Sequence, residues 1–151
     1  MTVPELRAAV VAEALSWLGT PYHHCADIKG AGVDCAMLLV RVYGNVSLVP
    51  AELDPRPYPW DWMLHRSEEM FLGWLSHHAV EVSAHGPAMA ADVQVWQYGR
   101  CYSHAAVCLG DGRLVHAVLG ERCVALADEF SAELQGRPMK RFRLASLMEP
   151  A

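Results

Sequence analysis

GVDCAMLLVRVY, residues 32–43, is the stretch of this 151-residue chain that decides its fold. Asp34 is a favoured N-cap residue, so it predicts a helix that begins at Cys35 and is closed by Gly44. The segment after Asp34 is apolar almost all round, which is typical of a helix buried in a core. Cys35 is therefore expected in the first turn of a buried helix.

A cysteine in this position has a physical reason to react. The thiolate is the nucleophilic form, and the unpaired amides and partial positive charge of a helix N-terminus lower a thiol pKa from ~8.5. The same amides can hold an oxyanion. Free cysteine is also commonly buried as a small apolar residue, so its position alone leaves both interpretations of Cys35 open.

The rest of the chain predicts helices first and strands later. Thr2 with Glu5 is a capping box that starts a helix over 3–18, and a second amphipathic helix is expected over about 61–78. Short apolar stretches after Pro87 predict strands at 93–98, 104–109, 113–118, 123–127 and 140–144. This order predicts one α+β domain over residues 1–151, with a mostly antiparallel sheet of five or six strands packed on the cysteine helix.

Two histidines in neighbouring strands are candidates for the base that a thiol nucleophile needs. His104 begins one strand and His116 lies in the next, joined by Gly110-Asp111-Gly112. A three-residue loop would pair Leu109 with Arg113 and place both imidazoles on one face as diagonal neighbours. A two-residue turn would place them on opposite faces.

Composition excludes several classes of function. Apolar residues make up 53% and charged residues 19% of the chain, which predicts a globular domain with its own core. The net charge of −5 without a clustered basic face argues against nucleic acid, and no stretch approaches the length of a membrane span. The N-terminus lacks the pattern of a signal peptide, so synthesis in the cytoplasm is expected.

The cysteines argue against a disulfide framework and a structural zinc site, because there are five of them and no C-x-x-C pair. His23-His24-Cys25 looks like a metal cluster at first sight. Adjacent residues cannot easily aim at one ion, however, and no second half of a site is evident in the sequence. The sequence therefore predicts no metal and no cofactor.

Three blocks together resemble the NlpC/p60 family of papain-like cell-wall cysteine peptidases: WLGTPY (17–22), GVDC (32–35) and SHAAVCLGDGRLVHA (103–117). The resemblance implies a papain-like NlpC-type fold in which the nucleophile begins a buried helix. It implies a triad of Cys35 as nucleophile, His104 as base and His116 as the residue that orients the base. The interval of 12 residues between the histidines fits that family's hairpin.

The resemblance also implies residues around the triad. Tyr22 falls on the family's active-site tyrosine, whose hydroxyl lies near the thiol. Asp34, Ala36 and Ser103 are the other residues expected to bind substrate or hold the oxyanion. Ala91-Asp92-Val93 resembles the Gly-Asp-Leu with which a strand of the family begins.

Members of this family typically hydrolyse peptidoglycan stem peptides through a thioester, often between γ-D-glutamate and a diamino acid such as diaminopimelate. An insertion over about 45–90, the HHCADIKG segment (23–30) and the missing signal peptide look most like the phage and prophage tail-associated branch. Peptidoglycan fragments and phage tail proteins are thus the expected partners, with delivery to the cell wall by a phage or phage-like particle. Because Ala36-Met37 replace the family's usual Ser-Gly, a tail assembly component with weak or lost activity stays open. A thiol-dependent acyltransferase also stays open, because its nucleophile would look identical.

Overall fold

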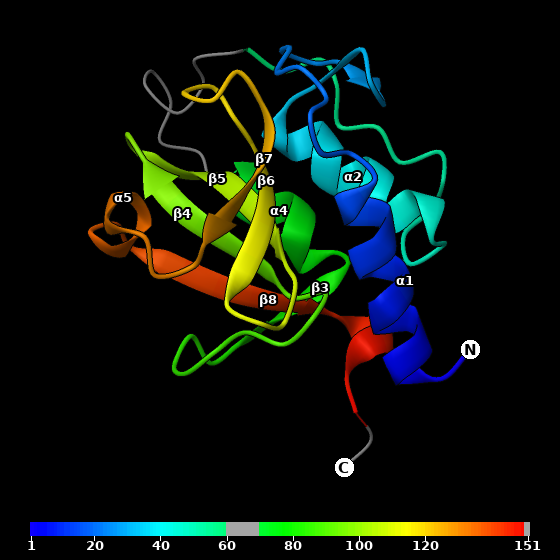
Figure 1. Ribbon diagram of the computed structural model, residues 1–151. Coiled ribbons are helices and arrows are strands. Elements are labelled where there is room, and N and C mark those ends of the chain that lie inside the picture. The colour runs from blue at the N-terminus through cyan, green and yellow to red at the C-terminus, as the bar shows by residue number, and fades with distance from the viewer. Residues whose placement is uncertain (60–69, 150–151) are drawn as a thin grey trace.

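The computed structural model describes residues 1–59 and 70–149. It is dominated by one antiparallel sheet of six strands in the order β3-β8-β4-β5-β6-β7 (Figure 1). The strands are β3 (Ala79–Val82), β4 (Val93–Tyr98), β5 (Cys101–Cys108), β6 (Arg113–Val118), β7 (Cys123–Asp128) and β8 (Met139–Leu144). The predicted α+β class and antiparallel sheet are confirmed. The sixth strand, β3, precedes Pro87 and was not predicted, because its four residues are half-exposed and too few for a clear alternation.

The helices begin where their caps predict. They are α1 (Val3–Leu15), α2 (Cys35–Asn45), α4 (Met70–Ser76), α5 (Ala132–Gln135) and the 3-10 helix η1 (Ala145–Leu147). The Thr2–Glu5 capping box is present, whereas α1 ends three residues before the predicted end, in a series of turns that reaches Gly19. The first part of the predicted helix over 61–78 lies outside the described residues. Within the described ranges no helix is both long and apolar enough to cross a bilayer.

The two faces of the sheet pack against different partners. Helices α1 and α2 lie against one face (Figure 1), where residues such as Val95, Ala105 and Val107 join the side chains of Met37 and Leu38 in the main core. On the opposite face a smaller cluster forms from Trp96, Ala106, Leu114 and, from α5, Leu134. By alternation along β5 and β6, the two histidines fall on this second face.

The start of β4 is held in a conformation that suits glycine. Ala91 has φ +73° and is fully buried, and its carbonyl accepts a 2.8 Å hydrogen bond from the Tyr43 hydroxyl on α2. Asp92 follows it, also fully buried. The hydrogen bond from Tyr43 to the Ala91 carbonyl therefore joins α2 to the start of β4, next to the buried carboxylate of Asp92.

Replacing Ala91 by glycine is expected to raise the free energy of unfolding by about 0.5–1 kcal/mol. Alanine in the left-handed region costs roughly 1–2 kcal/mol, and glycine avoids this while losing somewhat more backbone entropy on folding. Urea denaturation checks it, with Ala105→Gly in the middle of β5 as a control that should lower stability. A decrease for Ala91→Gly would mean that the position carries no strain.

Candidate active site

The N-terminus of α2 is capped by the carboxylate of Asp34, which is almost fully buried. Oδ1 accepts the amide of Met37 at 2.9 Å, and Oδ2 accepts the amide of Cys25 at 2.8 Å and the Tyr58 hydroxyl at 2.5 Å. The helix begins at Cys35, as the sequence predicted. Asp34 therefore fixes the first turn of α2 and ties it to two distant parts of the chain.

The hairpin between β5 and β6 has the register that brings its histidines together. Leu109 donates to the Arg113 carbonyl at 3.0 Å, and residues 107 and 108 pair with residues 115 and 114. The connection is thus the three-residue loop, closed by Gly112 at φ +88°. His104 Nε2 lies 2.8 Å from His116 Nδ1, and both rings are nearly buried. The predicted meeting of the two imidazoles is confirmed.

The thiol of Cys35 lies against the backbone on either side of His104. Its Sγ donates to the Ser103 carbonyl at 3.4 Å, and the amide of Ala105 also points at the sulfur. Ser103 is the extra residue of a β-bulge, because Trp96 pairs with His104 whereas residue 97 pairs with residue 102. Bulges bend a strand and re-aim its side chains. The Cys35 sulfur therefore lies against the β5 backbone that carries His104, and the His104 ring in turn contacts His116.

The pKa of the Cys35 thiol is raised to about 12. Burial is the main cause and the nearby Asp34 carboxylate the second, while the backbone amides of Ala105, Ala36 and Cys35 itself act in the opposite direction. The expected lowering of this pKa at the helix N-terminus is wrong, because the loss of hydration outweighs the attraction of the amides. In the free protein the thiol is protonated at neutral pH.

The two histidines are neutral as well. Burial lowers the pKa of His104 to about 3, with smaller contributions from His116 and Arg137. Burial likewise lowers the pKa of His116 to about 4, against an opposing effect of Glu121. A neutral imidazole can accept a proton. When His104 donates a hydrogen bond from Nε2–H to His116, the Nδ1 atom of His104 carries the lone pair that a base needs.

In the folded protein at pH 7, Cys35 is expected to react with iodoacetamide more slowly than Cys25 and Cys123, although all three side chains are half-buried. A thiol with a pKa of about 12 is ionised in only about one molecule in 10⁵ at pH 7. Peptide mapping by mass spectrometry after brief labelling between pH 6 and 10 measures each site, with protein unfolded in urea as the reference. Faster labelling of Cys35 than of the other two at pH 7 would show that the thiol is already activated.

Three tyrosines surround the reactive groups. Burial raises the pKa of Tyr22, with further contributions from Cys35 and Asp34, so its phenol stays protonated. Tyr58 and Tyr98 were not predicted. Tyr58 donates to Asp34, and the Tyr98 ring lies 5.3 Å from the His104 ring. A regular pairing of β4 with β5 would have suggested Tyr98 as a neighbour of His104. The bulge at Ser103 shifts the register there.

Ala36 and Ser103 contribute through their backbones. The Ala36 side chain lines an apolar pocket between α2 and α4 with Phe71 and Trp74. Its amide faces the sulfur, so only an oxyanion role fits this residue. The Ser103 hydroxyl is buried and donates to the Tyr98 carbonyl at 3.2 Å, while the Ser103 carbonyl holds the Cys35 thiol.

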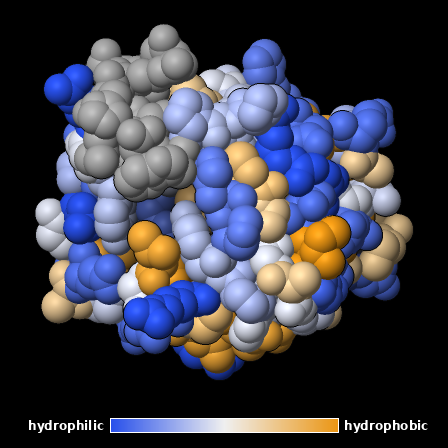
Figure 2. Space-filling view, turned by 90° about the horizontal axis from the view of Figure 1, so that it is seen from above, coloured by the Kyte–Doolittle hydropathy of each residue, from blue (hydrophilic) through white to orange (hydrophobic). Residues whose placement is uncertain are grey.

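One group of metal-ligating side chains lies beside the site. His24, Cys25 and Asp34 each offer a ligand atom, and these atoms lie within 4.8 Å of one another. The expectation that the His23-His24-Cys25 segment lacks a second half is therefore wrong, since Asp34 approaches from the start of α2. The surface at this end of the molecule is largely hydrophilic, with scattered apolar residues (Figure 2).

No family model matches the sequence, and a search of curated proteins finds no match either. Solved structures do resemble it. The NlpC/p60 domain of the peptidoglycan hydrolase SagA superposes with a TM-score of 0.56 at 23% identity, over 89% of this chain and 96% of that domain. The peptidoglycan hydrolase RipB from Mycobacterium tuberculosis gives 0.63 at 18% identity, over 98% of this chain and 67% of RipB.

NlpC1 from Trichomonas vaginalis has a TM-score of 0.65 at 14% identity over 93% of this chain, which spans only 44% of NlpC1. At these identities the likeness concerns the fold. It agrees with the predicted architecture, in which helices pack on an antiparallel sheet and a cysteine begins a buried helix. The chain therefore has the fold of NlpC/p60 domains.

Proposed function

We propose that this chain is a cysteine peptidase of the NlpC/p60 family that hydrolyses amide bonds in peptidoglycan stem peptides. One observation carries the proposal: the Cys35 thiol lies against the backbone beside His104, whose Nε2 lies 2.8 Å from His116 Nδ1. A thiol at a helix N-terminus, a neutral imidazole and a group that orients the imidazole are the parts of nucleophilic catalysis. The fold shared with NlpC/p60 domains of peptidoglycan hydrolases supports a cell-wall substrate.

The neutral resting state defines how the first step would proceed. As Sγ of Cys35 attacks the carbonyl carbon, its proton moves to Nδ1 of His104, and His116 Nδ1 accepts a hydrogen bond from the Nε2–H of the resulting imidazolium. The amides of Cys35 and Ala36 face the sulfur and would donate to the oxyanion. His104 then protonates the leaving amine as the C–N bond breaks. Water, deprotonated by His104, hydrolyses the thioester and restores the thiol.

The proposed scissile bond joins γ-D-glutamate to a diamino acid. Support for this choice comes from the three sequence blocks, which resemble peptidases with that specificity. The segment 23–30 and the stretch over about 45–90 support a further proposal, that a phage or phage-like particle carries the enzyme to the cell wall.

The test is hydrolysis of defined muropeptides by the purified protein, followed by mass spectrometry and assay of new amino groups. Wild-type protein is expected to release an amine at the γ-D-glutamyl bond, Cys35→Ala to release none, and Cys123→Ala in β7 to behave as wild type. Equal release by the Cys35→Ala variant, or no release from any fragment, would refute the proposal. An acyltransferase would instead attach the acyl group to an added amine, which changes the product mass.

A further inference from the structure

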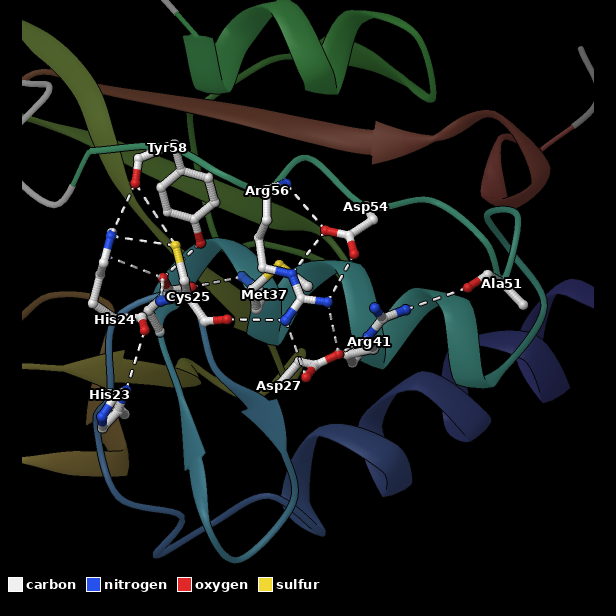
Figure 3. Close-up of polar contacts among 11 residues, drawn as sticks. His23, His24, Cys25, Asp27, Met37, Arg41, Ala51, Asp54, Arg56 and Tyr58 are labelled. Carbon is white, nitrogen blue, oxygen red and sulfur yellow. Dashed lines mark hydrogen bonds and ion pairs between the residues drawn. The ribbon is translucent and has the colours of Figure 1, made fainter.

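Three electron-rich atoms converge beside the N-terminus of α2, and the proposed peptidase reaction uses none of them. His24 Nε2 lies 3.2 Å from Cys25 Sγ and 2.9 Å from the Tyr58 carbonyl oxygen, and that oxygen lies 3.7 Å from the same sulfur (Figure 3). These spacings are close to those between neighbouring ligands of one tetrahedral metal ion, whose bonds are ~2.0 Å to nitrogen and oxygen and ~2.3 Å to sulfur.

Protons alone satisfy this arrangement poorly. If His24 Nε2 carries its proton and donates to the Tyr58 carbonyl, it cannot accept from the Cys25 thiol, which then has only a long 3.7 Å hydrogen bond to the same carbonyl. If Nε2 is unprotonated, its lone pair faces the carbonyl oxygen at 2.9 Å. A cation between the three atoms would remove this conflict, because imidazole nitrogen, thiolate and carbonyl oxygen would all donate to it.

The backbone holds Cys25 in the conformation that makes this possible for two adjacent residues. Cys25 has φ +59°, which turns its side chain back toward the His24 ring. Its amide donates to Asp34 Oδ2 at 2.8 Å, and its carbonyl accepts from Arg56 at 2.9 Å. Arg56 is itself fixed by an ion pair with Asp27 at 3.1 Å. The left-handed residue is thus fixed on both sides, as a preorganised ligand needs to be.

The remaining features of a metal site are also present. Asp34 Oδ2 lies 3.8 Å from the other ring nitrogen of His24, Nδ1, and favours a proton there, which leaves Nε2 free to bind a metal. The Tyr58 hydroxyl bonds the same Asp34 oxygen, which fixes Tyr58 relative to α2. The His24 side chain is 37% exposed, so a water molecule can reach a fourth position.

We propose that His24 Nε2, Cys25 Sγ and the Tyr58 carbonyl bind a thiophilic divalent cation of the zinc class, with water as the fourth ligand. Thiolate and imidazole together select such ions over magnesium or calcium. Binding releases the Cys25 thiol proton to solvent and joins the loop over 23–27 to the segment over 54–58. The site is distinct from Cys35, His104 and His116, so it stands whether or not the chain is a peptidase.

Cobalt(II) is the probe, because a cobalt–thiolate bond gives a charge-transfer absorption that a cobalt–imidazole or cobalt–water complex lacks. Titration of the reduced full chain is expected to produce this absorption with one equivalent of cobalt, and zinc is expected to displace it. Cys25→Ser should abolish the band and His24→Gln should weaken cobalt binding at least tenfold, whereas Cys35→Ala should leave both unchanged. This last variant separates the site from the other cysteine–histidine cluster.

Loss of the band in Cys35→Ala, with retention in Cys25→Ser, would assign the metal to the triad and overturn the proposal. Absence of a thiolate band in wild-type protein would overturn it as well. An independent measurement is the thermal midpoint, which zinc at a hundredfold excess over its Kd should raise by about 5 °C or more in wild type and not in Cys25→Ser. An equal rise in both proteins would place the binding elsewhere.

Discussion

His104→Ala is expected to lower kcat/KM for muropeptide hydrolysis by about 10²–10⁴-fold while leaving the protein folded. The Cys35 pKa of about 12 makes this dependence strong, because almost no thiolate exists without a base to remove the proton as the bond forms. Steady-state kinetics at pH 7 measure the loss, and circular dichroism with a thermal scan checks the fold. A change in kcat/KM within about tenfold would show that His104 is not the base.

Two substitutions of His116, by glutamine and by alanine, are expected to lower the activity to different extents. In His116→Gln the amide oxygen can still accept a hydrogen bond from the Nε2–H of His104, whereas in His116→Ala no acceptor remains at that position, so the alanine variant should lose more activity than the glutamine variant. Because the His104 pKa is about 3 and the His116 pKa about 4, kcat/KM is expected to fall only below about pH 5 in wild type. The exposed His85, replaced by alanine, should change neither the rate nor the pH profile.

The parts of the site that sequence predicted are those that short segments determine. Asp34 as a cap fixes where α2 begins, and this alone placed Cys35 in the first turn. Gly112 fixes the three-residue loop, and the strand alternation that follows brought His104 and His116 together. Each of these relations lies within about a dozen residues, where backbone preferences are strong.

The parts that sequence missed depend on packing between distant segments. The Cys35 pKa depends on how completely β5 and its neighbours remove water from the sulfur, which no local pattern records. Tyr58 reaches Asp34 across 24 residues of sequence, and the same contact completes the group around Cys25. The pattern of residues 23–25 suggested a metal only weakly, because the turn at Cys25 comes from hydrogen bonds to Asp34 and Arg56.

Asp92→Ala is expected to lower the free energy of unfolding by about 3–5 kcal/mol, the cost of removing one partner of a buried ion pair. The Asp92 carboxylate is fully buried and accepts two hydrogen bonds from Arg143, at 2.8 and 2.9 Å. It also lies 3.8 Å from the buried Arg7, whose Nε has no hydrogen-bond partner among the described residues. Without Asp92, two cations would share an interior that offers no countercharge at that point.

The effect should extend beyond electrostatics, because Asp92 connects three elements. Arg7 belongs to α1 and Arg143 to β8, while Asp92 itself stands at the start of β4, and its backbone carbonyl accepts the amide of Cys108 on β5. Urea denaturation measures the change, and the slope of the free energy against urea tests whether the denatured state is altered. The matched control is Asp111→Ala, which removes an Asp–Arg pair with Arg113 of similar geometry at the surface.

Water screens the Asp111 pair, so its loss should change stability far less than the loss of Asp92. If both variants lose the same small amount, the buried carboxylate is dispensable, and the two arginines must find other partners or water on relaxation. The double variant Asp92→Ala with Arg143→Leu decides between charge and connectivity. Partial recovery relative to Asp92→Ala would show that the stranded cation is the main cost, whereas a further loss would show that Asp92 acts mainly by joining β4 to its neighbours.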